Sequence, residues 1–104
     1  MIIFEDLREK QIRFTDERMT HIKEDHPELF EQFDKIKETL LTPDRIILSI
    51  TDNSVELFYK LFEKTPVTKK HMCVLVKNNK NDYFVITAYF TDSVKKGQLI
   101  WEKK

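Results

Sequence analysis

Side chains suited to phosphate binding and proton transfer recur in the second half of the chain. Cations and hydroxyls can hold the oxygens of a phosphate, and an imidazole can accept or donate a proton near neutral pH. If the predicted strands alternate regularly, these groups share one open sheet face, with only Glu56 nearby as an acid. The predicted members of that face are Arg45, Ser49, Lys60, His71, Thr87, Tyr89 and Thr91.

The three histidines each have a structural reading beside the chemical one. His21 and His26 are five positions apart, about 140° around an ideal helix, which does not suit the i, i+4 pair of a metal site. His21 can bond a carboxylate such as Asp25, or act as a general base at the rim of the sheet. His26 precedes Pro27 and can cap the next helix, and His71 can be a solvated loop end.

The remaining reactive side chains do not form a pattern that indicates a bound metal or cofactor. Cys73 is the only cysteine and lies in an apolar strand without a helix N-terminus beside it, so we expect neither a zinc site nor a reactive thiol. Tyr59 and Tyr89 can be cross-strand packing residues or part of a site. The chain has no glycine-rich phosphate loop and no nucleophile elbow. We therefore expect no metal and no cofactor.

Two helices are predicted before the strands that must position these groups. Thr15 can cap a first helix over Asp16–Asp25, with acids in its first turn, and Pro27 ends that helix. A second helix is predicted over Glu28–Leu41, with Pro43 just beyond it. Its apolar stripe is Leu29, Phe33, Ile36 and Leu40.

The period changes to two after the helices. The predicted strands are Arg45–Thr51, Val55–Glu63, His71–Lys77 and Tyr83–Thr91. Short polar separators predict hairpins for the first and last pairs, and Lys64–Lys70 is a longer loop. Ile12–Thr15 is a short strand or extended lead-in, and Gln98–Trp101 is a final strand or packed extension. The chain is thus predicted to form a single α+β domain over residues 1–104, with two N-terminal helices on one face of a four-stranded antiparallel sheet.

Alternation assigns most strand residues to a face but leaves the second strand ambiguous. Either Leu57, Tyr59 and Leu61 point toward the helices, or Phe58 and Phe62 do. Because an inward Lys60 without a partner is costly, we expect Lys60 on the open face. In the last strand, one predicted face holds Phe84, Ile86, Ala88 and Phe90, and the other holds Tyr83, Val85, Thr87, Tyr89 and Thr91.

Composition and charge limit the classes of partner and location. The 104 residues carry 18 basic and 18 acidic side chains, which argues against broad, non-specific duplex binding. Residues 1–41 have net charge −4 and residues 42–104 have +4, which indicates either a polyanion surface or ordinary charge mixing between layers. With no long apolar run and no basic, apolar leader at Met1–Asp6, we expect a cytoplasmic protein without a membrane partner.

Several short motifs together resemble the phage-associated branch of the barnase/EndoU/colicin/RelE-like (BECR fold) nucleases. They are His21-Ile22-x-x-x-His26-Pro27-Glu28, Pro43-Asp44-Arg45, Tyr59-Lys60, Cys73-Val74-Leu75-Val76-Lys77 and Val85-Ile86-Thr87-Ala88-Tyr89. The resemblance covers roughly residues 12–95 and implies a RelE/barnase-like arrangement of helices followed by a four-stranded sheet.

The resemblance implies a metal-independent endoribonuclease, a hydrolase in which a ribose 2′-hydroxyl attacks its own phosphodiester. The implied catalytic residues are His21, Lys60, Thr87, Tyr89 and Arg45, with His26, Tyr59 and His71 as secondary candidates. The implied partners are RNA and an antitoxin or immunity protein, as in toxin–antitoxin systems. The alternative is a non-catalytic module of the same fold that binds a protein or nucleotide, and a third possibility is a dimerising domain.

Overall fold

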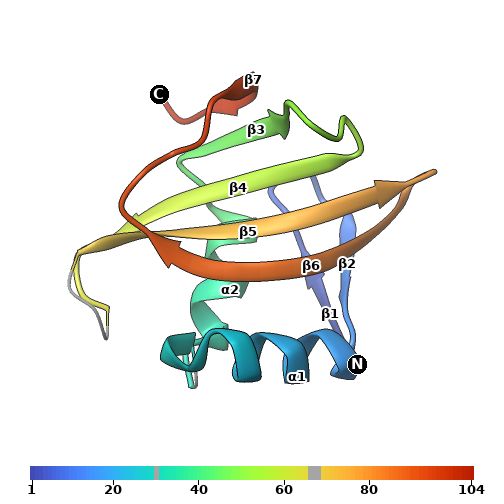
Figure 1. The fold of residues 1–104 in the computed structure, drawn as a ribbon. Helices are drawn as coiled ribbons and strands as arrows, with labels where there is room; N and C mark the ends of the chain where they lie inside the picture. The colour runs from blue at the N-terminus through green and yellow to red at the C-terminus, as the bar shows by residue number, and fades with distance from the viewer. Residues whose placement is uncertain (30, 66–68) are drawn as a thin grey trace.

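The computed structural model describes residues 1–29, 31–65 and 69–104, which form a seven-stranded mixed sheet and two α-helices (Figure 1). The helices are α1 (Asp16–Asp25) and α2 (Phe33–Leu41), with a 3₁₀ turn, η1 (Pro27–Leu29), between them. The strands are β1 (Ile2–Glu5), β2 (Gln11–Phe14), β3 (Arg45–Ser49), β4 (Val55–Phe62), β5 (Lys70–Asn79), β6 (Asp82–Thr91) and β7 (Gly97–Glu102).

The predicted four-stranded sheet is wrong, because three further strands extend it at both edges. The strand order is β1-β2-β6-β5-β4-β3-β7, so the predicted meander β3–β6 forms the centre. β1 and β2 form an antiparallel hairpin, β2 runs parallel to β6, and β7 pairs with β3. The helices are not N-terminal, because β1 and β2 precede them. β1 was not predicted, whereas β2 and β7 lie at Ile12–Thr15 and Gln98–Trp101, which the sequence allowed as short strands without indicating their partners.

Helix α1 has its predicted bounds, whereas α2 begins later than predicted. The Thr15 hydroxyl accepts a hydrogen bond from the Arg18 backbone N–H at 3.3 Å, as expected for an N-cap. Glu31 has a φ of 63°, a left-handed conformation that an α-helix cannot contain, so the predicted helix over Glu28–Leu41 divides into η1 and α2. Phe30, within that prediction, lies outside the described residues, as do residues 66–68 of the predicted Lys64–Lys70 loop.

The two predicted hairpins are confirmed. β3 pairs antiparallel with β4, and β5 pairs antiparallel with β6. Lys80 and Asn81, between β5 and β6, both have positive φ values, of 51° and 68°. Two such residues in succession form the tight turn whose twist matches that of an antiparallel pair. This turn sets the register of β5 against β6.

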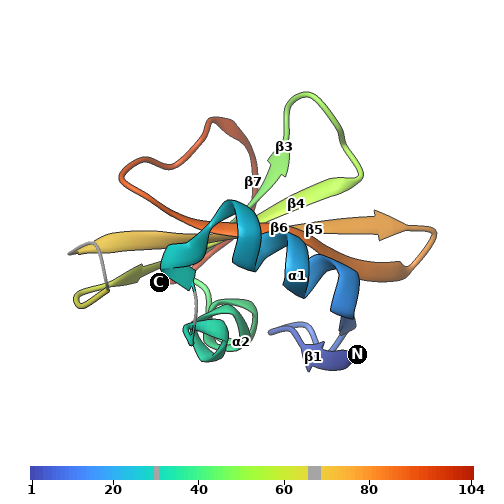
Figure 2. The ribbon, with the colours of Figure 1, turned by 60° about the horizontal axis from the view of Figure 1, so that its bottom comes forward.

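Each sheet face has its own apolar cluster. The face toward the helices, here called the helix face, buries Phe14, Ile22, Leu29, Ile36, Leu40, Ile46, Phe58, Met72, Val74, Val76, Val85 and Ala88. The opposite face, called the second face, buries Ile47, Val55, Leu57, Tyr59 and Cys73 against Leu75, Ile86, Tyr89 and Val94. Figure 2 shows α1, α2 and β1 on one side of the sheet, and the β3–β4 and β6–β7 connections on the other.

The predicted orientation of β4 is wrong. Phe58 is fully buried on the helix face, and Lys60 alternates onto the same side as Phe58. The cost expected for an inward lysine is avoided because the Lys60 ammonium donates a hydrogen bond of 2.8 Å to the Thr42 carbonyl, at the C-cap of α2. A cation at a helix C-terminus is favourable, since the last carbonyls have no partner within the helix.

A bulge in β6 also changes the predicted faces of that strand. The register shifts between Leu75 and Val76, which pair with Thr87 and Val85, so Ile86 is an extra residue. Tyr83 and Val85 therefore face the helices rather than the second face, and Ile86 moves to the second face. Regular alternation fails here because the inserted residue reverses the direction of every side chain before it.

The helix face encloses one charged cluster. The Arg8 guanidinium donates hydrogen bonds of 2.6 to 3.0 Å to both Asp6 and Glu56, whose side chains are only 0% and 9% exposed. The same guanidinium lies over the rings of Phe58 and Tyr83. Burial lowers the pKa of Arg8, but the hydrogen bonds to Glu56 and Asp6 outweigh burial and raise it, so Arg8 stays charged. Neither described helix is long and apolar enough to cross a membrane.

Candidate functional site

Four residues of the second face lie directly opposite one another on adjacent strands. Arg45 pairs with Tyr59, Tyr59 with Cys73, and Cys73 with Tyr89. Directly opposite residues point to the same side of a sheet, so their side chains form a row across β3, β4, β5 and β6. We call this set the tyrosine row. It places two phenols on the second face, one on each side of the Cys73 thiol.

Each phenol has an imidazole beside it. The rings of His71 and Tyr59 meet edge to face, with centroids 6.4 Å apart, and those of His26 and Tyr89 are tilted at 5.8 Å. His71 comes from β5, whereas His26 is the C-cap residue of α1, which packs beside β6 (Figure 1). The second face therefore carries two imidazole–phenol pairs, separated by Cys73.

Burial keeps the two phenols and the thiol of the row uncharged. It is the largest cause that raises the pKa of both Tyr59 and Tyr89 above the ordinary phenol value, so both remain protonated hydrogen-bond donors at neutral pH. Burial also raises the pKa of the Cys73 thiol to about 11, which excludes a thiolate nucleophile at neutral pH. The Tyr59 hydroxyl accepts a hydrogen bond of 3.0 Å from the Lys95 backbone N–H.

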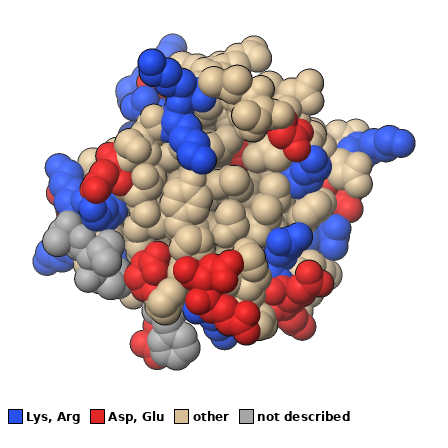
Figure 3. All heavy atoms as spheres, in the orientation of Figure 1, with Lys and Arg blue, Asp and Glu red and all other residues tan. Residues whose placement is uncertain are grey.

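Charged side chains surround this face, and its centre is uncharged. Figure 3 shows tan surface in the middle, with lysines and arginines around the rim and acids gathered along the edge formed by α1. Several rim cations are already paired: Arg45 with Glu102 at 3.9 Å, and Lys70 with Asp92. Of the two cations expected on this face, Arg45 lies at the rim and Lys60 lies on the helix face.

Thr87 contributes a hydroxyl without a partner. It lies directly opposite Leu75, which belongs to the second-face cluster. Among the buried side-chain oxygens and nitrogens of the described residues, the Thr87 Oγ1 alone has no hydrogen-bond partner. A buried hydroxyl left unpaired is unfavourable, so an acceptor that reached it after a local movement would bind more favourably for that contact.

The structure divides the predicted site residues into two groups. The residues that meet on or reach the second face are Arg45, Tyr59, His71, Thr87, Tyr89 and His26. Lys60 lies on the helix face, and His21 is exposed on α1, where it pairs with Asp25 at 3.2 Å. His26, predicted as a cap of the second helix, instead ends α1.

Sequence reasoning missed Lys95. This residue lies in the irregular connection between β6 and β7, where no periodicity indicates which face the backbone will cross. Nothing in the local sequence signals its hydrogen bond to Tyr59, which is 36 residues away in the chain. Among the described residues, no three histidine, cysteine, aspartate or glutamate side chains gather as a metal site requires.

The site thus combines two partly exposed imidazoles, the partly exposed Tyr89 and buried Tyr59 phenols, and the buried, unpartnered Thr87 hydroxyl, a set suited to acid–base chemistry on a phosphate. The chain belongs to the family described as phage-Barnase-EndoU-ColicinE5/D-RelE like nuclease2, which matches residues 2–102. It is a phage-associated nuclease-like domain, and the resemblance found in its sequence is confirmed. Neither the curated proteins nor the solved structures include a match to it.

Proposed function

We propose that the chain is a metal-independent endoribonuclease that binds RNA on the second face. The observation that carries this proposal is the tyrosine row with an imidazole beside each phenol. Tyr59 and Tyr89 lie two strands apart, about 10 Å by the usual strand spacing. Both phenols interact with the Cys73 thiol between them, so the two imidazole–phenol pairs flank one position on the second face, where we place the phosphodiester.

The reaction requires one imidazole in each protonation state. The neutral imidazole accepts the proton of the ribose 2′-hydroxyl as its oxygen attacks the adjacent phosphorus. The bond from phosphorus to the 5′-oxygen breaks, and the protonated imidazole donates its proton to that leaving oxygen. The products are a 2′,3′-cyclic phosphate and a free 5′-hydroxyl. His26 and His71 are the pair that the second face offers for these two roles.

The neighbouring donors stabilise the charge that builds up on the phosphate. Tyr59 and Tyr89 are neutral O–H donors, Thr87 has an unpartnered hydroxyl, and Arg45 supplies a cation at the rim. Donors held in a fixed arrangement need little rearrangement as charge develops on the phosphate. His21 and Lys60, which the resemblance implies as catalytic residues, take no part in the proposed reaction.

The net charge of the chain and the charges around the second face favour a short, single-stranded RNA segment as the substrate over a duplex. The chain has no net charge, and the α1 edge of the second face is acidic (Figure 3). Without a broad basic surface, little affinity comes from counterion release along a duplex. The phage association of the family fits a cytoplasmic toxin held in check by an antitoxin or immunity protein.

The proposal is tested by cleavage of a mixed-sequence RNA oligonucleotide in excess EDTA. We expect products ending in a 2′,3′-cyclic phosphate, a bell-shaped pH profile of kcat/KM, and no cleavage of the 2′-deoxy oligonucleotide. His26→Asn and His71→Asn should each lower kcat by about 10²- to 10⁴-fold, the usual contribution of a general acid or base. His21→Asn is the matched control on α1 and should retain activity.

Two results would contradict this proposal. Cleavage that persists in both His26→Asn and His71→Asn would place the chemistry elsewhere. RNA binding without cleavage by the wild-type chain would instead favour the non-catalytic binding module.

A further inference from the structure

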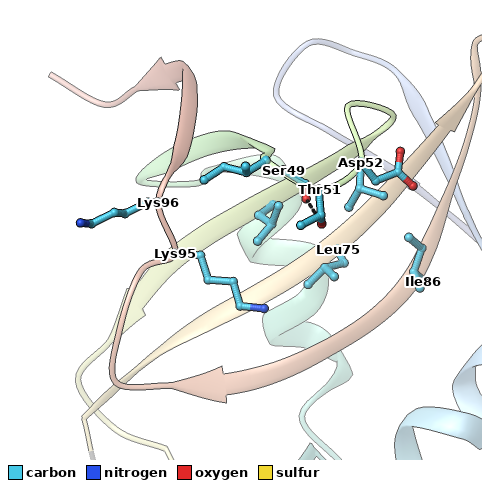
Figure 4. Close-up of a pocket in the computed structure, with 10 residues that line it drawn as sticks. Ser49, Thr51, Asp52, Leu75, Ile86, Lys95 and Lys96 are labelled. Carbon is cyan, nitrogen blue, oxygen red and sulfur yellow. Dashed lines mark hydrogen bonds between the residues drawn. The ribbon is translucent and has the colours of Figure 1, made fainter.

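A pocket of about 370 Å³ opens on the second face beside the tyrosine row (Figure 4). Its floor is aliphatic, from Val55, Leu57, Leu75 and Ile86, and polar groups of the β3–β4 connection form one wall. The opposite wall is the β6–β7 connection. Lys95 extends from that connection over the floor toward Leu75, whereas Lys96 points away (Figure 4). The volume lies in the range of small-molecule sites.

The strand register places this pocket next to the proposed cleavage site. Leu57 is directly opposite Leu75, and this pair is two residues along the strands from the pair of Tyr59 and Cys73. Two residues of a strand span about 7 Å. Lys95 joins the two places, because its backbone N–H binds the Tyr59 hydroxyl while its side chain covers the pocket.

We propose that this pocket holds the base of the nucleotide on the 5′ side of the cleaved bond, with the Lys95 ammonium on its 3′-phosphate. This assignment of the base to one side of the bond rests on the proposed function. An aliphatic floor suits the flat apolar face of a base. The hydroxyls of Ser49 and Thr51, 3.2 Å apart at the wall, can each donate to or accept from its polar edge.

The charges around the pocket favour a nucleotide over an apolar side chain of a protein partner. Among the described residues, Lys95 has no carboxylate partner, so its charge is available to a phosphate. The one acid at the wall, Asp52, accepts hydrogen bonds from Ser54 and from Lys77, which offset its charge. The pocket therefore offers an apolar surface beside a free cation.

The same chemistry predicts weak discrimination between bases. Hydroxyls that donate or accept equally well cannot read a fixed hydrogen-bond pattern, and an apolar floor distinguishes ligands mainly by area. A purine covers more of the floor than a pyrimidine. We expect 3′-AMP and 3′-GMP to bind several-fold more tightly than 3′-CMP and 3′-UMP.

The test is the binding of 3′-AMP and of adenosine, followed by NMR chemical-shift titration. Lys95→Met keeps the aliphatic stem and removes the charge. It should weaken 3′-AMP binding by about tenfold, as expected for one charge-assisted hydrogen bond, and leave adenosine binding nearly unchanged. Lys96→Met is the matched control, and its affinity for 3′-AMP should equal that of the wild type.

A second variant tests the pocket itself. Leu75→Phe places a larger side chain on the floor, and should weaken adenosine and 3′-AMP alike by about tenfold or more. Equal losses in Lys95→Met and Lys96→Met, or unchanged binding in Leu75→Phe, would overturn the inference. So would binding of an apolar peptide in preference to any nucleotide.

These outcomes are independent of cleavage, because neither ligand contains a cleavable bond. Nucleotide binding with the predicted pattern in a chain that cuts no RNA would support the pocket and contradict the nuclease proposal. Cleavage of RNA without 3′-nucleotide binding in the pocket would do the reverse.

Discussion

The polar groups of the helix face and those of the second face differ in how fully they are hydrogen-bonded within the protein. On the helix face, Arg8 lies between Asp6 and Glu56 and uses its hydrogen-bonding capacity within the protein. On the second face, Thr87 has no partner, and neutral phenols lie beside imidazoles. A satisfied cluster stabilises a fold, whereas donors left free in a fixed arrangement can act on a ligand.

The difference follows from how each face is covered. The two helices and β1 close the helix face, so any polar group there must find a partner in the protein. Among the segments that the structure describes, the irregular β3–β4 and β6–β7 connections cross the second face (Figure 2). Groups at its margin can therefore exchange a water for a substrate. If this comparison is right, changes on the helix face alter stability, and changes on the second face alter function.

The largest expected effect on stability is at Arg8. Arg8→Met leaves two buried carboxylates without their cation, and should lower the free energy of unfolding by about 3 kcal/mol or more. Arg13→Met is the control, because Arg13 pairs with Asp82 in solvent and its loss should have a much smaller effect on stability. Urea denaturation measures both. Equal effects at the two arginines would remove the distinction between the faces.

The next effect is expected at Gly97, the only glycine in the chain. A Cβ here would meet the Leu48 backbone carbonyl and lie 2.5 Å from the Ile47 side chain, so β7 could not keep its place beside β3. Gly97→Ala should cost about 1–3 kcal/mol, the range for overpacking. The neighbouring Gln98→Ala should cost little. Thermal unfolding compares the two, and a Gly97→Ala protein as stable as wild type would contradict the close packing of β7.

A smaller effect is expected at Tyr59. Tyr59→Phe removes the acceptor of the Lys95 N–H and should lower stability by about 1 kcal/mol. It should also lower RNA cleavage more than its effect on folding explains, because it removes a donor from the row. Tyr83→Phe, on the helix face, is the control for cleavage. We compare kcat at a temperature where all three proteins are folded, and equal kcat values would count against the row.

The smallest effect is expected at Lys60. Lys60→Met removes one hydrogen bond to the C-terminus of α2 and should cost about 0.3–1 kcal/mol, without a change in cleavage. Urea denaturation and the cleavage assay on the same preparation measure the two quantities. If a folded Lys60→Met protein lost most of its cleavage activity, Lys60 would belong to the active site, as the family resemblance implies.

Local patterns were enough to predict the elements at the centre of the fold. The bounds of α1 follow from Thr15 and Pro27, and the strands β3–β6 follow from alternation between polar turns. What the patterns could not supply was pairing between distant segments. β1 was not predicted, and nothing at Ile12–Thr15 indicated that this short strand, β2, would pair with β6 in the second half of the chain.

The candidate site, like the fold, was predictable only where local alternation decides which way a side chain points. Regular alternation placed His71, Thr87 and Tyr89 on one face, and they lie there. It failed at Lys60 because the partner that makes an inward lysine acceptable, the Thr42 carbonyl, is 18 residues away. The bulge at Ile86 and the path of Lys95 over Tyr59 are likewise set by tertiary contacts.

The most direct test of the account is to locate bound RNA on one of the two faces. We would titrate an RNA tetranucleotide with 2′-fluoro sugars, which cannot be cleaved, into the chain and follow side-chain NMR signals. The account predicts shifts at His26, His71, Tyr59 and Tyr89, with those of Arg8 and Lys60 unmoved. Shifts confined to Arg8, Lys60 or the outer surface of the helices would contradict it.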